Sequence, residues 1–399
     1  MKKQNTIESP TFKGREIVKT EKLPIKLWLD KSKMGEDTLN QARDLANLPF
    51  AFSHISIMPD THLGYGMPIG AILATKGAVV PNAVGVDIGC GMCSLRSNLK
   101  SVETSDLKEI LGIIRDTVPV GFKRHNKQQD EAFMPEKKGM LPIVEQEYEN
   151  GRYQIGTLGG GNHFIEIQKG SDGFIWIMVH SGSRNIGFTV AKHYNDIAKK
   201  LNEESGNKLP KDLAHIPESS EFYELYINEM NYCIEFALAN RKLMMEQVKA
   251  AFQKVVAEVE FSNFINKPHN FADIEEHFGE KVIVHRKGAT RARKGEWGMI
   301  PGSQGTQSYL VKGRGEAHSF QSCSHGAGRV MSRAQARRKL NLKEEVKLLK
   351  DQGILHALRH KSDLDEAPSS YKDIDEVMAN QTDLVDIQIA LQPLAVVKA

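Results

Sequence analysis

The sequence predicts an α+β protein: a single large mixed domain whose central β-sheets are flanked by helices. Two observations favour this class. Residues 50–98 alternate short apolar runs with glycine and proline, which is typical of closely connected strands. Residues 221–256 repeat apolar side chains at helical spacing, which predicts a long amphipathic helix. At 399 residues the chain is long enough to bury a large core.

The remaining elements follow from the same kinds of pattern. In chain order we expect a helix over 104–116, an exposed basic loop over 122–139, strands over 164–168 and 174–179, a loop over 202–220, a short strand over 281–284, a glycine-rich loop over 301–315 and a helix with a basic face over 332–340. Candidate motifs extend from residue 58 to the C-terminus with no linker between them. We therefore expect one domain, residues 1–399, whose ends meet over one site.

Composition limits the class of protein. The net charge is only +3, so any nucleic-acid contact has to come from local clusters of basic residues. Four cysteines are too few for a disulfide framework in a chain of this length and suggest a reducing compartment. The most apolar long stretch, residues 67–92, contains Lys76, Asp87 and several glycines, so it does not indicate a membrane span. We expect a cytoplasmic protein with no membrane contact.

The stretch Val84–Met92 places a carboxylate and a thiol together among glycines. Asp87 and Cys90 are three residues apart in this stretch. A carboxylate suits a hard divalent ion and a thiolate suits a softer transition metal. The pair therefore indicates manganese, iron, cobalt or zinc rather than calcium or magnesium.

Five histidines stand out because they lie beside glycine-rich turns or at strand ends, where active-site residues tend to sit. They are His163, His180, His269, His285 and His325. For each one alone, a hydrogen-bonded structural histidine is an equally good interpretation. Eight others lie among polar neighbours, where we expect solvated surface positions: His54, His125, His193, His215, His277, His318, His356 and His360.

Cys90 and Cys93 form a Cys-x-x-Cys pair, which invites a zinc-knuckle or a redox interpretation. The chain has no second such pair, so a four-thiolate site cannot be completed. We interpret Cys90 as the ligand and Cys93 as structural, although the pair itself does not decide this. Cys233 falls on the apolar face of the helix over 221–256, where we expect a small buried hydrophobe.

Six strings, in order along nearly the whole chain, carry a resemblance to a known family. They are Met58-Pro-Asp-Thr-His-Leu-Gly-Tyr-Gly, Gly85-Val-Asp-Ile-Gly-Cys-Gly, Gly161-Asn-His-Phe-Ile-Glu, His180-Ser-Gly-Ser-Arg, His325-Gly-Ala-Gly-Arg and Tyr371-Lys-Asp-Ile-Asp. Together they resemble the RtcB family of RNA ligases. Members join an RNA 3′-phosphate or 2′,3′-cyclic phosphate to a 5′-hydroxyl end in RNA splicing or repair, using GTP and manganese. One departure is minor, because the chain ends Lys-Ala where Lys-Gly is expected.

The resemblance implies a centre for two Mn²⁺ ions. Asp87, Cys90 and His163 would hold one ion. Cys90, His180 and His269 would hold the other, so that the Cys90 thiolate bridges the pair.

The resemblance also implies the nucleophile and the nucleotide pocket. His325 matches the histidine that becomes covalently guanylylated, and Asp60 matches an acidic residue near the reacting phosphates. His285 has no ligand role in the family, so we expect it to be structural or adjacent to the substrate. The guanylate pocket would use Asn162, His163, Phe164, Ile165, Glu166, His269, Asn270, Pro301, Gly302, Ser303, Gln304, Ser308, Gly326, Ala327, Gly328, Tyr371 and Lys398.

RNA has to be held as well, and basic residues near these motifs are candidates. They are Arg184, the run Arg286, Lys287, Arg291, Arg293 and Lys294, and the stripe Arg329, Arg333 and Arg337. The competing interpretation of any charge run is a solvated face. We expect a monomer and leave open an activating protein partner. Two other functions remain open: a binuclear metallohydrolase, and a non-catalytic protein that binds nucleotides or RNA.

Overall fold

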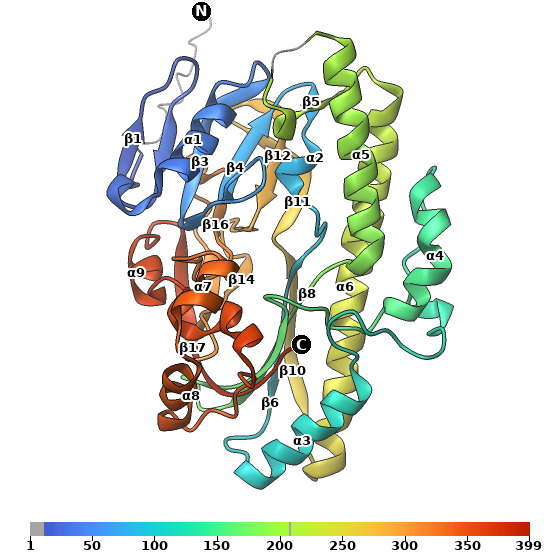
Figure 1. Cartoon of the computed structure of the whole chain (residues 1–399), viewed down its shortest axis with the longest axis vertical. Helices are drawn as coiled ribbons and strands as arrows, with labels where there is room; N and C mark the ends of the chain where they lie inside the picture. Colours follow the sequence, from blue (N-terminus) through green and yellow to red (C-terminus); the bar gives the residue numbers. More distant parts are fainter. Residues whose placement is uncertain (1–11, 207–208) are drawn as a thin grey trace, which may run out of the picture.

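The computed structural model describes residues 12–206 and 209–399, and two large β-sheets form its centre (Figure 1). The first sheet has six strands in the order β1-β2-β3-β4-β12-β11. Their bounds are Glu16–Val18, Ile25–Leu27, Ala51–His62, Ile69–Thr75, Glu280–Lys287 and Asn270–His277. Neighbouring strands are antiparallel except β2 and β3, which are parallel.

The second sheet has seven antiparallel strands in the order β10-β6-β8-β7-β17-β15-β14. Their bounds are Phe261–Pro268, Gly91–Ser97, Ile175–Ser181, Phe164–Gly170, Val385–Val397, Ser308–Gly313 and Trp297–Ile300. Two small sheets pair β13 (Ala289–Arg291) with β16 (Ser322–Ser324) and β5 (Ala78–Val79) with β9 (Ile216–Pro217). The C-terminal strand β17 thus lies inside the second sheet, next to β7.

Helices flank both sheets, as the predicted α+β class requires (Figure 1). They are α1 (Glu36–Ala46), α2 (Pro81–Val84), α3 (Thr104–Thr117), α4 (Pro142–Gln154), α5 (Arg184–Glu204), α6 (Glu221–Val255), α7 (Arg333–Lys339), α8 (Leu342–Asp351) and α9 (Ile374–Ala379). Ser220 caps the start of α6, because its side chain accepts a hydrogen bond from the Phe222 amide. Within the described residues, no helix combines the length and apolarity needed to cross a membrane.

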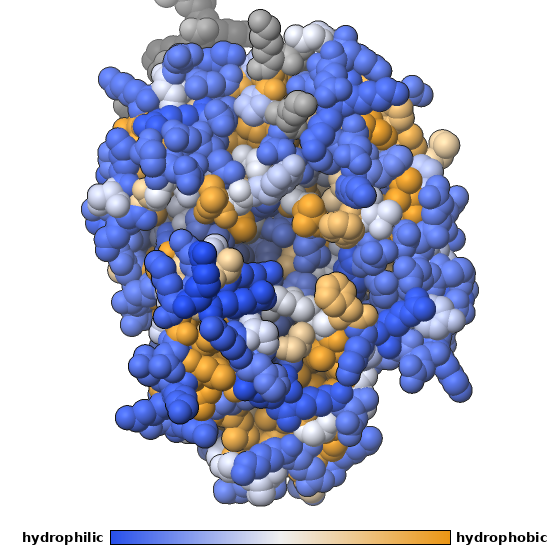
Figure 2. Space-filling model, viewed as in Figure 1, coloured by the Kyte–Doolittle hydropathy of each residue, from blue (hydrophilic) through white to orange (hydrophobic). Residues whose placement is uncertain are grey.

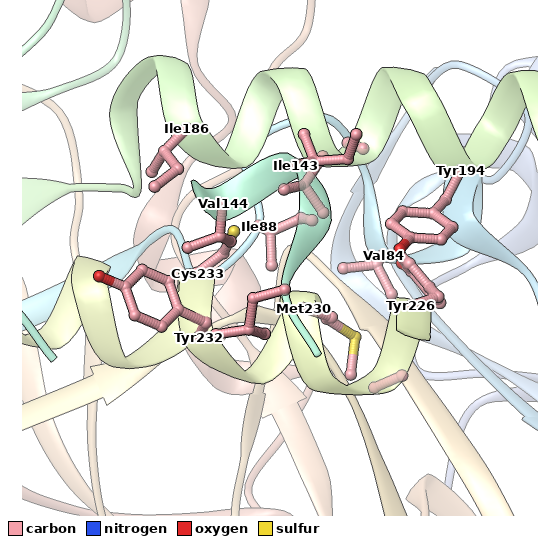
Figure 3. Packing of buried hydrophobic residues seen from close by; sticks show 14 of the residues in the cluster. Val84, Ile88, Ile143, Val144, Ile186, Tyr194, Tyr226, Met230, Tyr232 and Cys233 are labelled. Atoms are coloured by element: carbon pink, nitrogen blue, oxygen red, sulfur yellow. The ribbon is translucent and has the colours of Figure 1, made fainter. Parts of the chain in front are cut away.

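The helices α5 and α6 run side by side and bury a common core with α2 and α4 (Figures 1 and 3). Figure 3 shows Cys233 of α6 among Ile88, Val144 and Tyr232. The Cys233 side chain is fully buried, so its predicted core role is confirmed. The C-terminal half of α6 packs on the second sheet through a separate apolar cluster.

Several predicted elements are confirmed, and two predictions were incomplete. The helices over 104–116, 221–256 and 332–340, and the strands over 164–168 and 174–179, match observed elements. The stretch 301–315 is not wholly loop, because it contains β15 (Ser308–Gly313), which pairs with β14 and β17. The strand over 281–284 extends to Glu280–Lys287, and α4 and α5 were not predicted. One domain over 1–399 stays a prediction; its first eleven residues, and residues 207–208 of the predicted loop, lie outside the described part.

Candidate metal centre and nucleotide pocket

Adjacent strand ends bring the predicted metal ligands together. Asp87 and Cys90 lie on the turn between α2 and β6, His163 precedes β7, and His180 is near the end of β8. In the sheet, His180 is the partner of Met92 on β6 and of Phe164 on β7. The ligands therefore meet because β8 lies between β6 and β7 and ends where those two strands begin.

The fifth predicted ligand, His269, joins the centre through the backbone. Its amide donates to the Cys90 carbonyl over 2.8 Å, and the Gly89 amide donates to the Asn270 carbonyl over 2.8 Å. Gly89 has a φ of +74°, and a Cβ there would lie 2.8 Å from the Ile234 Cα of α6. Only glycine fits this turn, because both the backbone angle and the space against α6 exclude a side chain.

The side chains of these residues converge on one sulfur atom. Cys90 Sγ lies 3.4 Å from His163 Nε2 and 3.3 Å from His180 Nε2. His163 Nε2 is also 3.0 Å from Asp87 Oδ2, and His180 Nε2 is 3.3 Å from His269 Nε2. The five atoms form a continuous chain with Cys90 in its middle.

Hydrogen bonds to carbonyl oxygens set which histidine nitrogen is free to bind a metal. The Nδ1 of His163 faces the Leu158 carbonyl at 2.9 Å, and the Nδ1 of His180 faces the Asn162 carbonyl at 3.0 Å. A carbonyl only accepts, so each Nδ1 carries a proton, which leaves a lone pair on Nε2 of the neutral His180 ring. Such outer contacts are typical of metal-bound histidines. The lone pair of His180 then points at Cys90. The Nε2 of His163 instead lies between Cys90 Sγ and the Asp87 carboxylate.

Burial affects the protonation state of each predicted ligand, and it favours the neutral imidazole that can bind a metal. It lowers the pKa of His180 and of His269 well below the usual value, so both rings are neutral. Burial would raise the pKa of Asp87, but the hydrogen bond and charge of His163 outweigh it and hold that pKa low. Burial raises the pKa of the Cys90 thiol, which a bound metal would deprotonate. A mixed set of N, S and O ligands fits a transition metal.

Two residues of α6 that sequence reasoning missed hold the ligand loops in place. Arg241 Nη1 donates to the carbonyls of Gly89 and Ser181, at 2.9 Å and 2.8 Å. Asn240 Nδ2 donates to the Gly182 carbonyl over 3.0 Å. Both side chains are buried. The signal was present in the sequence, because Asn-Arg interrupts the apolar face of a long helix.

The candidate nucleophile His325 lies next to this centre. Its ring contacts that of His269 in a T-shaped arrangement, with centroids 4.8 Å apart. Its Nδ1 is 2.7 Å from Asp60 Oδ2, which also accepts from the amides of His325 and Gly326. Asp60 therefore binds the nucleophile directly and fixes the proton of His325 on Nδ1. Burial would raise the pKa of Asp60, but His325 outweighs it and keeps the carboxyl below its usual pKa.

A pocket of about 860 Å³ opens beside His325. Figure 2 shows a hollow near the middle of one face of the molecule, with hydrophilic and hydrophobic residues around it. The predicted residues that line the pocket are Asn162, Phe164, Glu166, Pro301, Gly302, Ser303, Gln304, His325, Gly326, Ala327, Gly328, Tyr371 and Lys398, together with the predicted metal ligand His180. Segments that are far apart in the sequence thus line the same pocket.

Five residues predicted for the pocket do not line it: Ile165, Ser308, Asn270 and the two predicted metal ligands His163 and His269. Ile165 points into the apolar core, because neighbouring side chains on β7 face opposite sides of the sheet. Ser308 is buried behind the wall, where its Oγ accepts from the Gly302 amide. Asn270 donates to the Asp87 carbonyl and accepts from the Gly288 amide, so it supports the metal ligands.

One carboxylate of the pocket wall, Glu366, was missed by sequence reasoning. It accepts from the Tyr371 hydroxyl at 2.5 Å and from Lys398 Nζ at 3.1 Å. Arg329 Nη1 and Arg333 Nε lie 3.4 Å and 3.5 Å from it. Burial would raise its pKa, but the charge of Lys398 and its other partners keep it ionised. Glu366 therefore connects the C-terminal lysine to the segment that follows His325.

The second carboxyl group of the pocket behaves differently. Glu166 is buried on β7, and Gln168 Nε2 donates to its Oε2 over 2.5 Å. Burial raises the pKa of Glu166 to about 8, against the opposing effects of Gln168 and Lys398. A ligand that offers two N–H donors would favour the ionised form. The Watson–Crick edge of guanine offers two such donors, at N1 and N2.

The basic residues divide into two groups. In the first run, Arg286 is fully buried and donates to Glu275, and Lys287 donates to the carbonyls of Tyr65 and Asn82. Arg291 pairs with Glu296. Arg286 and Lys287 are buried, so the RNA contact considered for them was wrong. The Arg291 side chain is 28% exposed, and its RNA contact stays a prediction. A run of like charges in the sequence does not reveal which of its residues pair with carboxylates in the folded protein.

The second group lies near the pocket but is partly paired as well. Arg329 and Arg333 line the pocket, and both approach Glu366. Arg337 binds Asp365. Arg184 donates to the Gly121 carbonyl over 3.0 Å and to the Thr157 hydroxyl, at the start of α5.

Some histidines predicted at the surface are buried instead. His54, His277 and His318 are 1%, 5% and 5% exposed, so the expectation of solvated positions was wrong for them. Strand β3 carries His54 inward, where its Nε2 donates to the His318 carbonyl. His285 is a structural histidine: its Nδ1 donates to the Leu73 carbonyl and its Nε2 accepts from the Val80 amide.

Cys93 is buried and faces the Arg241 carbonyl, and all four cysteines are free thiols. Its predicted structural position is confirmed. The Cys-x-x-Cys pair forms no disulfide.

Comparison with known proteins agrees with this geometry. A family model described as tRNA-splicing ligase RtcB matches residues 41–142 and 134–399. The RNA-splicing ligase RtcB of Escherichia coli K12 is 38% identical over 96% of this chain and 99% of its own length. The tRNA-splicing ligases RtcB of Nanoarchaeum equitans and Thermococcus kodakarensis are 33% and 32% identical, each over 92% of both chains.

Proposed function

The chain belongs to the RtcB family of RNA-splicing ligases, and we propose that it uses His325 as a guanylylated nucleophile beside a centre for two Mn²⁺ ions. It is an enzyme, an RNA ligase that joins 3′-phosphate or 2′,3′-cyclic phosphate ends to 5′-hydroxyl ends. The observation that carries the proposal is the pairing of Asp60 with His325 at the edge of the pocket.

This pairing prepares His325 to attack a phosphate. The Asp60 carboxylate holds the proton on Nδ1, so Nε2 carries the lone pair. We propose that Nε2 forms a bond to the α-phosphorus of GTP while the bond to pyrophosphate breaks. The ring then becomes positively charged, and the ionised Asp60 stabilises that charge, as the aspartate does in a catalytic triad. Asp60 is a positioning residue that acts through His325.

Two exchange steps complete the proposed reaction. An oxygen of the RNA 3′-phosphate attacks the phosphorus of the histidine-bound guanylate, and the P–N bond to His325 breaks. The 5′-hydroxyl of the second RNA end then attacks the activated 3′-phosphate, loses its proton and displaces GMP. A covalent intermediate divides one difficult displacement into easier ones.

The Cys/His cluster would hold the metal ions. Asp87, Cys90 and His163 would hold one ion, and Cys90, His180 and His269 would hold the other. When bound, divalent ions neutralise the charge of phosphate oxygens during such displacements. The convergence of His163 and His180 on Cys90 supports metal binding, and the resemblance to the family supports manganese.

The pocket would take the guanine base. Glu166 can accept from the N1 and N2 donors of guanine, Tyr371 can stack on the ring, and Lys398 can donate to the base carbonyl. Glu366 supports this arrangement, because it binds both Tyr371 and Lys398. The monomeric state, an activating protein partner and the cytoplasmic location stay predictions, and so do the RNA contacts of Arg333 and the exposed basic residues.

Labelling the protein tests the proposal. Incubation with Mn²⁺ and GTP labelled at the α-phosphate should give an acid-labile adduct of one GMP on the protein. The His325→Ala variant should carry no label, whereas a control that removes an exposed histidine, His193→Ala, should be labelled normally. An unlabelled wild-type protein that cleaves RNA phosphodiesters would instead indicate a metallohydrolase.

A further inference from the structure

One surface feature near the pocket has no role in the proposed reaction. Phe122 lies in the basic loop that follows α3 and has an exposed fraction of 108%, so its ring makes almost no packing contact. Among the described large apolar side chains it is the most exposed. A single exposed apolar residue is common on protein surfaces, so the inference depends on the fixed backbone and the charges around this ring.

The backbone beneath this ring is tied down on both sides. The Gly121 amide donates to the Gly159 carbonyl over 2.8 Å, and the Lys123 amide donates to the Val120 carbonyl over 3.2 Å. Arg184 Nη2 donates to the Gly121 carbonyl over 3.0 Å. Phe122 is therefore presented from a fixed turn rather than from a loose loop.

The same contacts connect Phe122 to the active site. Gly159 begins the glycine loop 159–161, which leads directly into Asn162 and the predicted ligand His163. At the other end of this loop, a Cβ placed on Gly161 would lie 2.7 Å from Arg333 Nη2, so that guanidinium rests on the loop. Arg333 lines the nucleotide pocket. The glycine loop thus lies between the turn of Phe122 and the pocket wall.

The charge around Phe122 is positive. Residues 119–129 contain Lys123, Arg124 and Lys127 but no aspartate or glutamate. All three cations are exposed, and the Arg124 guanidinium lies 4.9 Å above the Tyr153 ring. An exposed aromatic ring among cations is the combination that binds single-stranded nucleic acid, because the ring stacks on a base and the cations attract phosphates.

We propose that Phe122 is a stacking platform for an unpaired nucleobase of the RNA strand that enters the pocket, with Lys123 and Lys127 beside the phosphates of that strand. This inference rests on the proposed ligase function and adds a binding surface outside the nucleotide pocket. It predicts that the enzyme prefers RNA ends with unpaired nucleotides over blunt duplex ends.

Fluorescence anisotropy with short labelled single-stranded RNAs tests the proposal. One RNA carries a 3′-phosphate and the other a 5′-hydroxyl, and GTP is left out so that no ligation occurs. Phe122→Ala should weaken binding of at least one RNA roughly 5- to 150-fold, the usual effect of losing one aromatic stack. Phe122→Trp should bind at least as tightly as the wild type. A matched control that removes an exposed ring from β10, Phe264→Ala (44% exposed before the change), should bind normally.

A second variant separates charge from stacking. Lys123→Ala should lower the dependence of log affinity on log salt by about one unit, whereas Phe122→Ala should leave this slope unchanged. Guanylylation of His325 should be normal in every variant, because none of these residues touches the pocket. Normal guanylylation with unchanged binding of both RNAs by Phe122→Ala would overturn the stacking role alone. Loss of guanylylation in the wild type would overturn the proposed function instead.

Discussion

Two groups of buried histidines differ in what their ring nitrogens face. The cluster histidines are His163, His180 and His269, and the packing histidines are His54, His277 and His318. In the cluster group, free Nε2 atoms converge on Cys90. In the packing group, His54 donates to a carbonyl, His277 pairs with Glu275, and His318 Nδ1 lies 2.5 Å from Lys26 Nζ.

The difference shows that burial alone does not mark a functional histidine. Both groups contain neutral rings, because burial lowers the pKa of His54 to about 3 and that of His180 well below the usual value. Only the cluster group brings ring nitrogens and a thiol together. Such a set of N and S atoms could hold a transition-metal ion. Substitutions in the cluster group should therefore reduce activity, whereas substitutions in the packing group should reduce stability and leave activity unchanged.

The largest effect on activity should follow the loss of the shared thiolate. Cys90→Ser should weaken Mn²⁺ binding and reduce ligation by more than roughly 100-fold, because even outer-shell partners of a metal cost 10- to 100-fold. Calorimetric titration with Mn²⁺ and a ligation assay measure both effects. Cys93→Ser is the matched control, since it puts the same hydroxyl three residues away in an equally buried position and should retain Mn²⁺ binding. Undiminished ligation by Cys90→Ser would remove the bridging role.

Asp60→Asn should separate the nucleophile from the metal cluster. The amide keeps the size of the side chain but no longer fixes the proton of His325 on Nδ1, so guanylylation should fall roughly 10²- to 10⁴-fold. Mn²⁺ binding should stay at the wild-type level. A parallel loss of both properties would mean that Asp60 supports the whole site rather than His325.

A smaller effect should come from pH. Burial raises the pKa of Glu166 to about 8, so the carboxyl is protonated at pH 6.5 and cannot accept from both guanine donors. GTP affinity should therefore rise with pH and level off above about 8, with a gain of roughly tenfold between pH 6.5 and 8.5. Glu166→Gln should bind GTP weakly at every pH. A flat profile in the wild type would exclude Glu166 as the guanine acceptor.

The smallest effect on activity should come from the packing histidines. His54→Phe removes one buried hydrogen bond and should lower the free energy of unfolding by about 1 kcal/mol. Guanylylation and Mn²⁺ binding should not change. The low pKa of folded His54 also makes the wild type lose stability as pH falls below about 6.5, where the unfolded ring gains a proton first. Denaturant titrations at pH 7.5 and 5.5 should show that the free energy of unfolding decreases less between these pH values for His54→Phe than for the wild type.

Local patterns predicted much of the fold. The apolar spacing over residues 221–256 and the short runs over 50–98 specify a helix and strands through contacts close in sequence, and the α+β class is confirmed. The same patterns missed α5 and the strand β15. The polar start of α5 follows a turn motif, and β15 is a strand only because β14 and β17 lie on both sides of it.

The site divides in the same way between sequence and structure. The sequence by itself determined which side chains could act as metal ligands, since Asp87, Cys90 and the strand-end histidines lie in or beside glycine-rich turns. Tertiary structure alone decided the rest. It paired Asp60 with His325, turned Ile165 away from the pocket and joined Glu366 to Lys398. The physical reason is that hydrogen bonds and ion pairs depend on the distance between atoms, and these partners are brought together only when the sheets form.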